Sequence, residues 1–272
     1  MVRLAFALLG LVAFLVIDTD AKADTLADIK AKGELVVGTK ADYPPYGFRD
    51  KSGEIVGIEP DLGADIAKRL GVKVRIEPVQ SSNRIQFLQQ GKIDLMIATM
   101  NVTDERKKAV GIVEPAYYAS GIAAFVNPKA GIKSAADLKG KPVCAIQGNF
   151  FNAELQSKFV QTDLVAFKGV PEAEQALTAG QCVAFVFDDT LILSKKKFEA
   201  DRWKDFDVVL ITEVTPLPWG IAVKLEDREQ PFGKFVSEAI TDWHKTGALI
   251  EIEKKWLGTN TKWLLDEQRK SK

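Results

Sequence analysis

Short apolar runs alternate with amphipathic stretches along most of the chain, and this pattern predicts strands and helices in turn. In the first half, the predicted strands are 35–38, 72–79 and 93–97, and the predicted helices are 60–70 and 82–90. In the second half, the predicted strands are 144–147, 163–167 and 183–187, and the predicted helices are 151–159, 171–179 and 190–198. This order is typical of mostly parallel sheets with helices on both faces. We therefore expect an α/β protein with two doubly wound lobes and a cleft between them.

Two extended segments, 118–126 and 219–223, are predicted to be the hinge strands that join the lobes. If both segments cross, the helices expected between 231 and 256 return to the first lobe. Lobe 1 is then discontinuous, with residues 24–120 and 221–272, and lobe 2 comprises residues 121–220. The charged end of the chain, from Trp263 onward, is expected to form a helical or frayed tail.

The first 23 residues have the pattern of a secretory signal peptide. Arg3 is followed by an apolar run at 4–17, and Ala21-Lys22-Ala23 offers an A-x-A cleavage site. The run is shorter than the roughly 20 residues that a membrane span needs, although an uncleaved N-terminal anchor is the alternative. No cysteine lies near the cleavage site for lipid attachment. We expect a mature chain that begins near Asp24 and is soluble in the periplasm.

Charge and residue usage exclude several classes of function. The 37 basic and 37 acidic residues leave no net charge, so nothing indicates a nucleic-acid partner. The single histidine, His244, is too few for a histidine metal cluster and argues against a Ser-His-Asp triad. We expect His244 on the surface of a helix and the lysines at 195–197 at a solvated helix end. No phosphate-binding glycine loop is present, and we expect neither a cofactor nor a metal.

The only two cysteines, Cys144 and Cys182, each lie in or beside a predicted strand. An exported chain enters an oxidising compartment, where such a pair tends to form a disulfide. Two buried free thiols are the alternative. We predict a disulfide between Cys144 and Cys182.

The segment 98–106 places small polar groups and an arginine between a buried strand and a helix start. Thr103 is a predicted N-cap, with two acidic residues in the first turn after it. Backbone groups, the hydroxyl of Thr99 and the amide of Asn101 can orient a small zwitterion, while Arg106 can hold its carboxylate with two parallel hydrogen bonds. A surface arginine in an ordinary turn is the other interpretation of these residues.

Motifs in a fixed order over essentially the whole mature sequence carry a family resemblance. They are Gly33-Glu34-Leu35-Val36-Val37-Gly38, Asp42-Tyr43-Pro44-Pro45-Tyr46, Gly57-Ile58-Glu59-Pro60-Asp61-Leu62, Gln89-Gln90-Gly91-Lys92-Ile93-Asp94, Thr103-Asp104-Glu105-Arg106, Asp137-Leu138-Lys139-Gly140-Lys141, Gln147-Gly148 and Ala179-Gly180. The chain resembles the periplasmic solute-binding proteins of ABC importers, in the branch that binds polar amino acids (family 3). The resemblance implies a type II periplasmic-binding-protein fold whose two lobes close on an amino acid. It also implies a monomer, without enzyme activity, that delivers its ligand to a membrane permease.

The resemblance also implies roles for individual residues. Arg106 is similar to the arginine that takes the ligand α-carboxylate, with backbone N–H groups of Asn101 and of Asn149 or Phe150 beside it. Asp188 is similar to the aspartate that pairs with the α-ammonium, with the Ala98 carbonyl and the Thr99 hydroxyl as further acceptors. Tyr46 resembles the aromatic residue that lies over the ligand side chain, and Asp42 belongs to the same set. Two alternatives stay open: Asp188 as a helix N-cap, and Tyr46 as a turn residue packed on Pro44 and Pro45.

A further resemblance predicts which ligand side chain is bound. Ser82-Asn83-Arg84-Ile85 is similar to a segment of acidic-amino-acid binders whose arginine reaches the side-chain carboxylate, and Lys40 is expected at the same end. Glutamate or aspartate is then the expected ligand. The alternative is that Arg84 only begins a helix and pairs with a neighbouring acid. The apolar Phe150 and Phe151, where relatives often carry hydroxyl residues, could instead favour a larger or less polar side chain.

Two other functions remain open on the same fold. Periplasmic dehydratases of cyclohexadienyl acids share it, and Asp188 or Asp189 would be the candidate general acid. A ligand-sensing partner of a membrane receptor would use the same ligand-closed surface.

Overall fold

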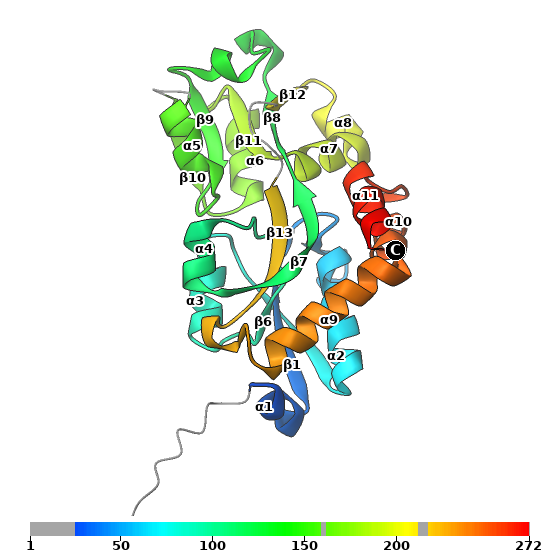
Figure 1. Ribbon diagram of the computed structural model, residues 1–272. Coiled ribbons are helices and arrows are strands. Elements are labelled where there is room, and N and C mark those ends of the chain that lie inside the picture. The colour runs from blue at the N-terminus through cyan, green and yellow to red at the C-terminus, as the bar shows by residue number, and fades with distance from the viewer. Residues whose placement is uncertain (1–24, 159–161, 212–216, 272) are drawn as a thin grey trace, which may run out of the picture.

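A computed structural model describes residues 25–158, 162–211 and 217–271, and Figure 1 shows its two lobes. The lower lobe carries both ends of the described chain, and the upper lobe carries its middle, coloured green to yellow. The signal peptide predicted at 1–23 lies outside the described residues. No helix in the described part of the chain combines the length and the apolar character that a membrane span requires.

The lower lobe is built on a five-stranded sheet with helices packed against it. Its strands, in spatial order, are β5 (Lys73–Pro78), β1 (Glu34–Thr39), β6 (Leu95–Met96), β13 (Leu217–Val223) and β7 (Gly111–Ser120). Its helices are α1 (Thr25–Lys32), α2 (Ile58–Leu70), α3 (Arg84–Gln89), α4 (Asp104–Ala109), α9 (Pro231–Thr246), α10 (Ala248–Leu257) and α11 (Lys262–Lys270), with a 3-10 turn at Leu225–Asp227. A small second sheet joins β2 (Asp42–Tyr43), β3 (Gly47–Arg49) and β4 (Ile55–Val56).

The upper lobe repeats this architecture. Its strands, in spatial order, are β10 (Asp163–Phe167), β9 (Pro142–Ile146), β11 (Ala184–Asp188), β8 (Ile122–Val126) and β12 (Asp207–Ile211). Its helices are α5 (Phe151–Lys158), α6 (Val170–Thr178), α7 (Asp189–Phe198) and α8 (Ala200–Trp203), with 3-10 turns at Pro128–Ala130 and Ala135–Leu138. The predicted two-lobed α/β class is therefore confirmed.

The sheets are mixed, although the sequence predicted mostly parallel ones. In each lobe, the first three strands in spatial order run parallel, whereas the remaining pairings are antiparallel. The antiparallel pairings are made by one strand in each sheet that runs against its neighbours: β13 between β6 and β7 below, and β8 between β11 and β12 above. A strand that leaves or enters a lobe through the hinge is not followed by the helical crossover that a parallel neighbour requires.

The passages between lobes differ in part from the predicted ones. β7 ends at Ser120 in the lower sheet, and β8 begins at Ile122 in the upper sheet, so the first passage lies at Gly121 within the predicted segment. The second predicted segment, 219–223, is instead part of β13 and pairs with β7 in the lower sheet. The predicted lobe boundary at 220/221 therefore falls inside a strand, because a buried apolar strand and an extended connection have the same pattern.

Two surface predictions are wrong. His244 lies on α9 as expected, but its side chain is buried, and its Nε2 lies 2.8 Å from the Ala116 carbonyl, to which it donates. Its position follows the buried stripe of Val236, Ile240 and Trp243.

The lysines at the end of α7 are likewise not simply solvated. Lys195 is buried in ion pairs with Glu174 and Glu199, and Lys196 donates to the carbonyls of Trp203 and Phe206. Polar partners at a helix end therefore satisfy charges that the sequence pattern assigned to water.

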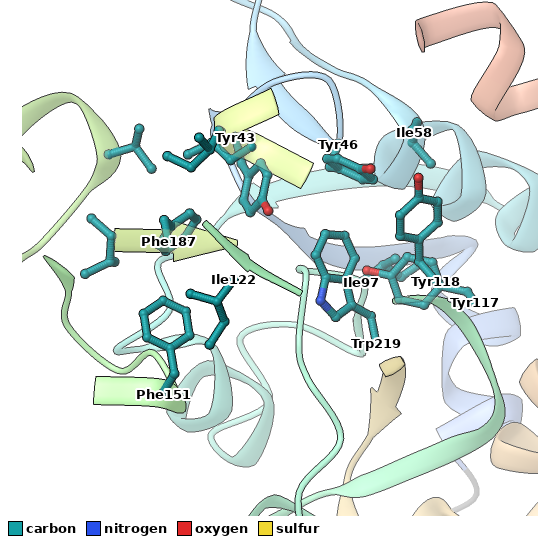
Figure 2. Close-up of a cluster of buried hydrophobic side chains, with 14 of the residues drawn as sticks. Tyr43, Tyr46, Ile58, Ile97, Tyr117, Tyr118, Ile122, Phe151, Phe187 and Trp219 are labelled. Carbon is teal, nitrogen blue, oxygen red and sulfur yellow. The ribbon is translucent and has the colours of Figure 1, made fainter. Parts of the chain in front are cut away.

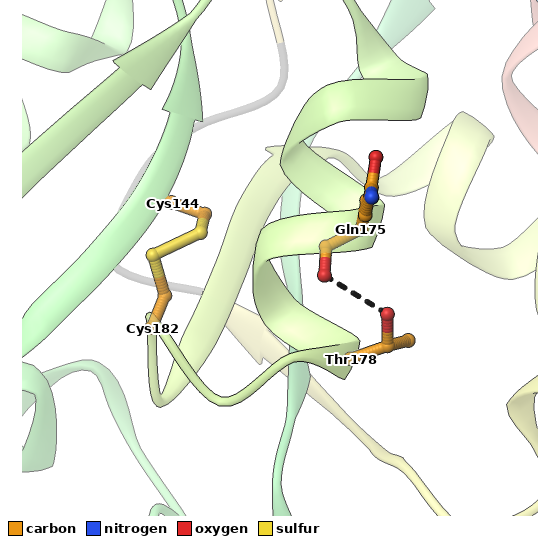
Figure 3. Close-up of a disulfide and its surroundings, with 4 residues drawn as sticks. All are labelled: Cys144, Gln175, Thr178 and Cys182. Atoms are coloured by element: carbon orange, nitrogen blue, oxygen red, sulfur yellow. Dashed lines mark hydrogen bonds between the residues drawn. A yellow bond between two sulfur atoms is a disulfide. The ribbon is translucent and has the colours of Figure 1, made fainter.

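The predicted disulfide between Cys144 and Cys182 is present, as Figure 3 shows. Cys144 lies in β9, and Cys182 lies two residues before the neighbouring β11, so pairing of these strands places the thiols together. Both side chains are buried. The bond therefore links β9 to the segment that enters β11 in the upper sheet.

We expect removal of this bond to weaken the upper lobe. The chain-entropy model gives about 4 kcal/mol for a loop of this length, and measured losses are often smaller. A Cys144→Ser/Cys182→Ser variant should therefore unfold at a lower denaturant concentration than the wild-type protein. Mass spectrometry of non-reduced peptides first verifies the bond in the wild-type protein. If the variant and the wild-type protein then unfold at the same denaturant concentration under oxidising conditions, this prediction is contradicted.

Candidate ligand-binding site

Most predicted site residues meet where the two lobes face one another. In the lower lobe, the segment 98–101 follows β6, Arg84 begins α3 and Arg106 lies on α4; in the upper lobe, Asp188 ends β11. Carboxyl ends of parallel strands are where α/β proteins present polar groups to ligands. Ala98, Thr99, Asn101, Arg84, Arg106 and Asp188 are all buried.

Arg106 links the two lobes through its guanidinium. Its Nη1 donates to the Asn101 carbonyl at 2.9 Å, and its Nη2 donates to the Gly148 carbonyl of the upper lobe at 3.0 Å. Thr103 caps the helix as predicted and accepts from the Arg106 N–H at 3.2 Å. Burial lowers the pKa of Arg106, against the opposing charge of Asp188. A fixed, desolvated guanidinium of this kind suits a carboxylate.

Arg84 is a second buried guanidinium, 2% exposed. Its Nη1 donates to the Ala98 carbonyl, while its Nε is buried without a hydrogen-bond partner. Among the described residues, no carboxylate forms an ion pair with it, so the alternative of a neighbouring acid finds no support. Burial and the charge of Arg106 lower its pKa to about 9, although Asp188 and Glu59 oppose the shift.

Asp188 occupies the N-cap position of α7, but its carboxylate makes no capping hydrogen bond. Its Oδ2 accepts from the Tyr43 hydroxyl of the lower lobe at 3.0 Å, and its Oδ1 is buried without a partner. Burial raises its pKa to about 7, and Asp189 adds to the shift, although Tyr43, Arg84 and Arg106 oppose it. One acceptor oxygen is thus available to a cation in a site that disfavours an unpaired carboxylate.

The aromatic residue that reaches Asp188 is Tyr43, whose hydroxyl also lies 2.7 Å from the Thr190 Oγ1. Tyr46 lies beside it, in a cluster with Tyr43, Tyr118 and Trp219, as Figure 2 shows. Tyr46 is therefore not merely a turn residue packed on the prolines. Its predicted place over the ligand side chain stays a prediction, and Tyr43 joins the candidates.

Lys40 and Asp42 form a pair at the border between the lobes. The buried Nζ of Lys40 lies 3.2 Å from Asp42 Oδ1 and 3.5 Å from the Ser81 hydroxyl. Asp42 Oδ2 accepts from the Val170 N–H at the start of α6, 3.1 Å away. Asp42 thus contacts the upper lobe, and its carboxylate neutralises Lys40. A contact of Asp42 or Lys40 with the ligand stays a prediction.

The upper-lobe wall near Arg106 is the turn before α5. The Asn149 N–H, which was expected beside the ligand carboxylate, donates instead to the Ile146 carbonyl within this turn. Phe150 is half-buried against Phe151, which packs toward Phe187 in the core of the upper lobe. Gly148 approaches the lower lobe so closely that a Cβ there would lie 2.7 Å from the Ser81 carbonyl oxygen.

Sequence reasoning missed Tyr43, Glu59 and Tyr117 as parts of this region. Glu59 accepts from the Thr99 N–H at 2.6 Å and from the Tyr117 hydroxyl. A signal existed for Glu59, because it lies on the same helical stripe as the buried Leu62 and Ile66. No pattern distinguished Tyr43 from Tyr46.

A family model described as bacterial extracellular solute-binding proteins, family 3, matches residues 35–259. The chain belongs to this family. The predicted resemblance is therefore confirmed, and it covers both lobes and the residues that meet between them.

Individual relatives bear names of different amino-acid binders. The chain is 32% identical over 243 residues to the ABC transporter glutamine-binding protein GlnH of Bacillus subtilis (strain 168), which covers 88% of this chain and 86% of the relative. It is 29% identical over 253 residues to the L-cystine-binding protein TcyJ of Escherichia coli (strain K12), with 92% of each chain covered.

A crystal structure of an ancestral amino acid-binding protein, described as a precursor of cyclohexadienyl dehydratase, superposes with a TM-score of 0.76 at 31% identity. The match covers 86% of this chain and 99% of that one. The described residues contain no group of three or more histidine, cysteine or acidic side chains that could hold a metal ion.

Proposed function

We propose that this family 3 protein captures an amino acid between its lobes outside the cytoplasm and delivers it to the permease of an ABC transporter. The α-carboxylate is held by Arg106, and the α-ammonium by Asp188 with Tyr43 beside it. Support comes from two buried, oppositely charged groups that interact between the lobes, and from relatives that are named for amino acids. Contacts from both lobes make the ligand part of the closed form, so binding favours closure.

The ligand side chain carries a carboxylate, which makes glutamate or aspartate the substrate. The observation that carries this assignment is Arg84, a buried guanidinium whose Nε has no partner. A buried cation without a counter-ion is costly, and a bidentate carboxylate would satisfy it. Arg84 and Arg106 donate to different carbonyls of the same segment, those of Ala98 and Asn101, so each guanidinium can hold one of the two carboxylates of one ligand.

Binding should depend on pH through Asp188, because burial raises its pKa to about 7. The ammonium needs the ionised carboxylate, so ligand binding lowers this pKa and releases a proton below pH 7. The dissociation constant should then rise roughly tenfold for each unit of pH below 7 and stay flat just above it. Calorimetry in buffers of different ionisation enthalpy should find about one proton released at pH 6 and almost none at pH 8. Proton uptake at pH 6 would contradict the assignment.

A thermal-shift panel of the twenty amino acids tests the proposed function as a whole, on protein from which bound ligand has been removed by unfolding and refolding. Glutamate or aspartate should raise the melting temperature most. The same preparation is then incubated with prephenate and with arogenate. Stabilisation without turnover supports capture, whereas product formation would make the protein a dehydratase.

A further inference from the structure

Thr99 has a backbone conformation that threonine seldom adopts. Its φ is +47°, and no other non-glycine residue in the described ranges has a positive φ. β-branched side chains are strained in this left-handed region, so such a conformation persists only where its surroundings hold it. Thr99 lies in the segment between β6 and α4 that carries the candidate ligand contacts.

The group that holds Thr99 is a carboxylate. Glu59 is fully buried, and its Oε1 accepts from the Thr99 N–H at 2.6 Å and from the Tyr117 hydroxyl on β7, whose oxygen is a second, longer acceptor of the same N–H at 3.2 Å. The start of α2 fixes the position of Glu59, because the N–H groups of Ile58 and Glu59 donate to the carbonyls of Pro45 and Tyr46. The carboxylate therefore acts from a rigid support.

The segment that Glu59 holds also anchors both arginines. The Ala98 carbonyl accepts from Arg84, and the Asn101 carbonyl accepts from Arg106. Thr99 lies between these two carbonyls, so its conformation sets the distance and angle between the guanidinium groups. A change at Thr99 would move both ends of a ligand held by them.

We propose that Glu59 is a positioning residue for amino-acid binding: it holds Thr99 in the left-handed conformation that places Arg84 and Arg106 for the two carboxylates of one ligand. The proposal rests on the proposed function, because it assigns a role within the same site. Glu59 itself faces Tyr117, Arg84 and Lys40, and its Oε2 is buried without a partner. In this role Glu59 positions the residues that hold the ligand.

Three single variants and two double variants test this role. Glu59→Leu keeps the volume of the side chain but removes the acceptor, and Glu59→Gln keeps one acceptor oxygen. Thr99→Gly supplies a residue that adopts a positive φ without support. Affinity for glutamate is measured by calorimetry, and melting curves establish that each variant folds; Glu59→Ala replaces Glu59→Leu if leucine does not fold.

We expect Glu59→Leu to weaken glutamate binding more than tenfold, and Glu59→Gln to stay within about threefold of the wild-type protein, since it retains the acceptor. In the Thr99→Gly background, Glu59→Leu should lower glutamate affinity less than threefold, because glycine adopts the positive φ without the Glu59 carboxylate. The Thr99→Gly/Glu59→Gln variant is the matched control for the Thr99→Gly/Glu59→Leu variant.

Equal losses from Glu59→Leu in both backgrounds would overturn the proposal, because a general packing role does not depend on residue 99. Wild-type affinity in Glu59→Leu would overturn it as well. If the wild-type protein itself binds no amino acid, the proposed function fails instead, and the two failures are thereby distinguished.

Discussion

Replacement of Arg106 by alanine is expected to abolish amino-acid binding while the lobes remain folded. Loss of one partner from a buried, hydrogen-bonded charge pair costs about 2–5 kcal/mol or more, which corresponds to a loss of affinity of roughly thirtyfold to several thousandfold. Two carbonyls that Arg106 now satisfies, those of Asn101 and Gly148, would also lose their donor. Calorimetric titration, together with a melting curve of the ligand-free variant, measures both effects.

Two further variants sharpen this prediction. Arg106→Lys keeps the charge but not the planar pair of donors, so its affinity should lie between those of the wild-type protein and Arg106→Ala. Arg69→Ala removes an exposed arginine of α2 that pairs with Asp65 and Asp242, and it should leave affinity unchanged. Retained affinity in Arg106→Ala would place the carboxylate site elsewhere.

Replacement of Arg84 by alanine is expected to change which ligand is preferred. Glutamate affinity should fall at least thirtyfold, because a ligand carboxylate would lose its buried counter-ion, whereas glutamine should lose less. The ligand-free variant should melt at the same temperature as the wild-type protein or higher. Arg84 is buried with an unpartnered Nε, so its removal relieves a desolvated charge.

The matched control for Arg84 is Arg75→Ala on β5, which removes an exposed arginine that pairs with Glu34 and Glu77. It should change neither affinity nor preference. If Arg84→Ala binds glutamate as tightly as the wild-type protein does, the ligand side chain lies elsewhere and the acidic-ligand assignment is wrong.

Local pattern predicted most of the fold. Apolar runs and helix starts placed the parallel strands of both sheets and most of the helices, but not β12 or the small sheet of β2, β3 and β4. The compartment predicted the bond between Cys144 and Cys182. Pattern alone could not separate a hinge strand from a core strand, because both are extended and apolar. Residues 219–223 therefore appeared as a crossing, whereas Trp219 and Ile221 pack and pair inside the lower sheet.

The candidate site was predicted unevenly for physical reasons. Arg106 stands at a clear turn from a strand to a helix, so the pattern itself pointed to it, whereas the role of Asp188 was predicted only from the resemblance. Glu59 and Tyr43 act through contacts between segments that are far apart in the chain. Glu59 is 40 residues from Thr99, and Tyr43 is 145 residues from Asp188. Only the folded chain brings such groups together. Asp42 likewise emerged as a contact to Val170 across the lobes.

The central claim is that two buried guanidinium groups hold the two carboxylates of one acidic amino acid. Its most direct test is calorimetric titration of refolded, ligand-free wild-type protein with glutamate, aspartate and glutamine at pH 7.5. We expect glutamate or aspartate to bind at least tenfold more tightly than glutamine. Equal or tighter binding of glutamine, or no heat with any of the three, would contradict it.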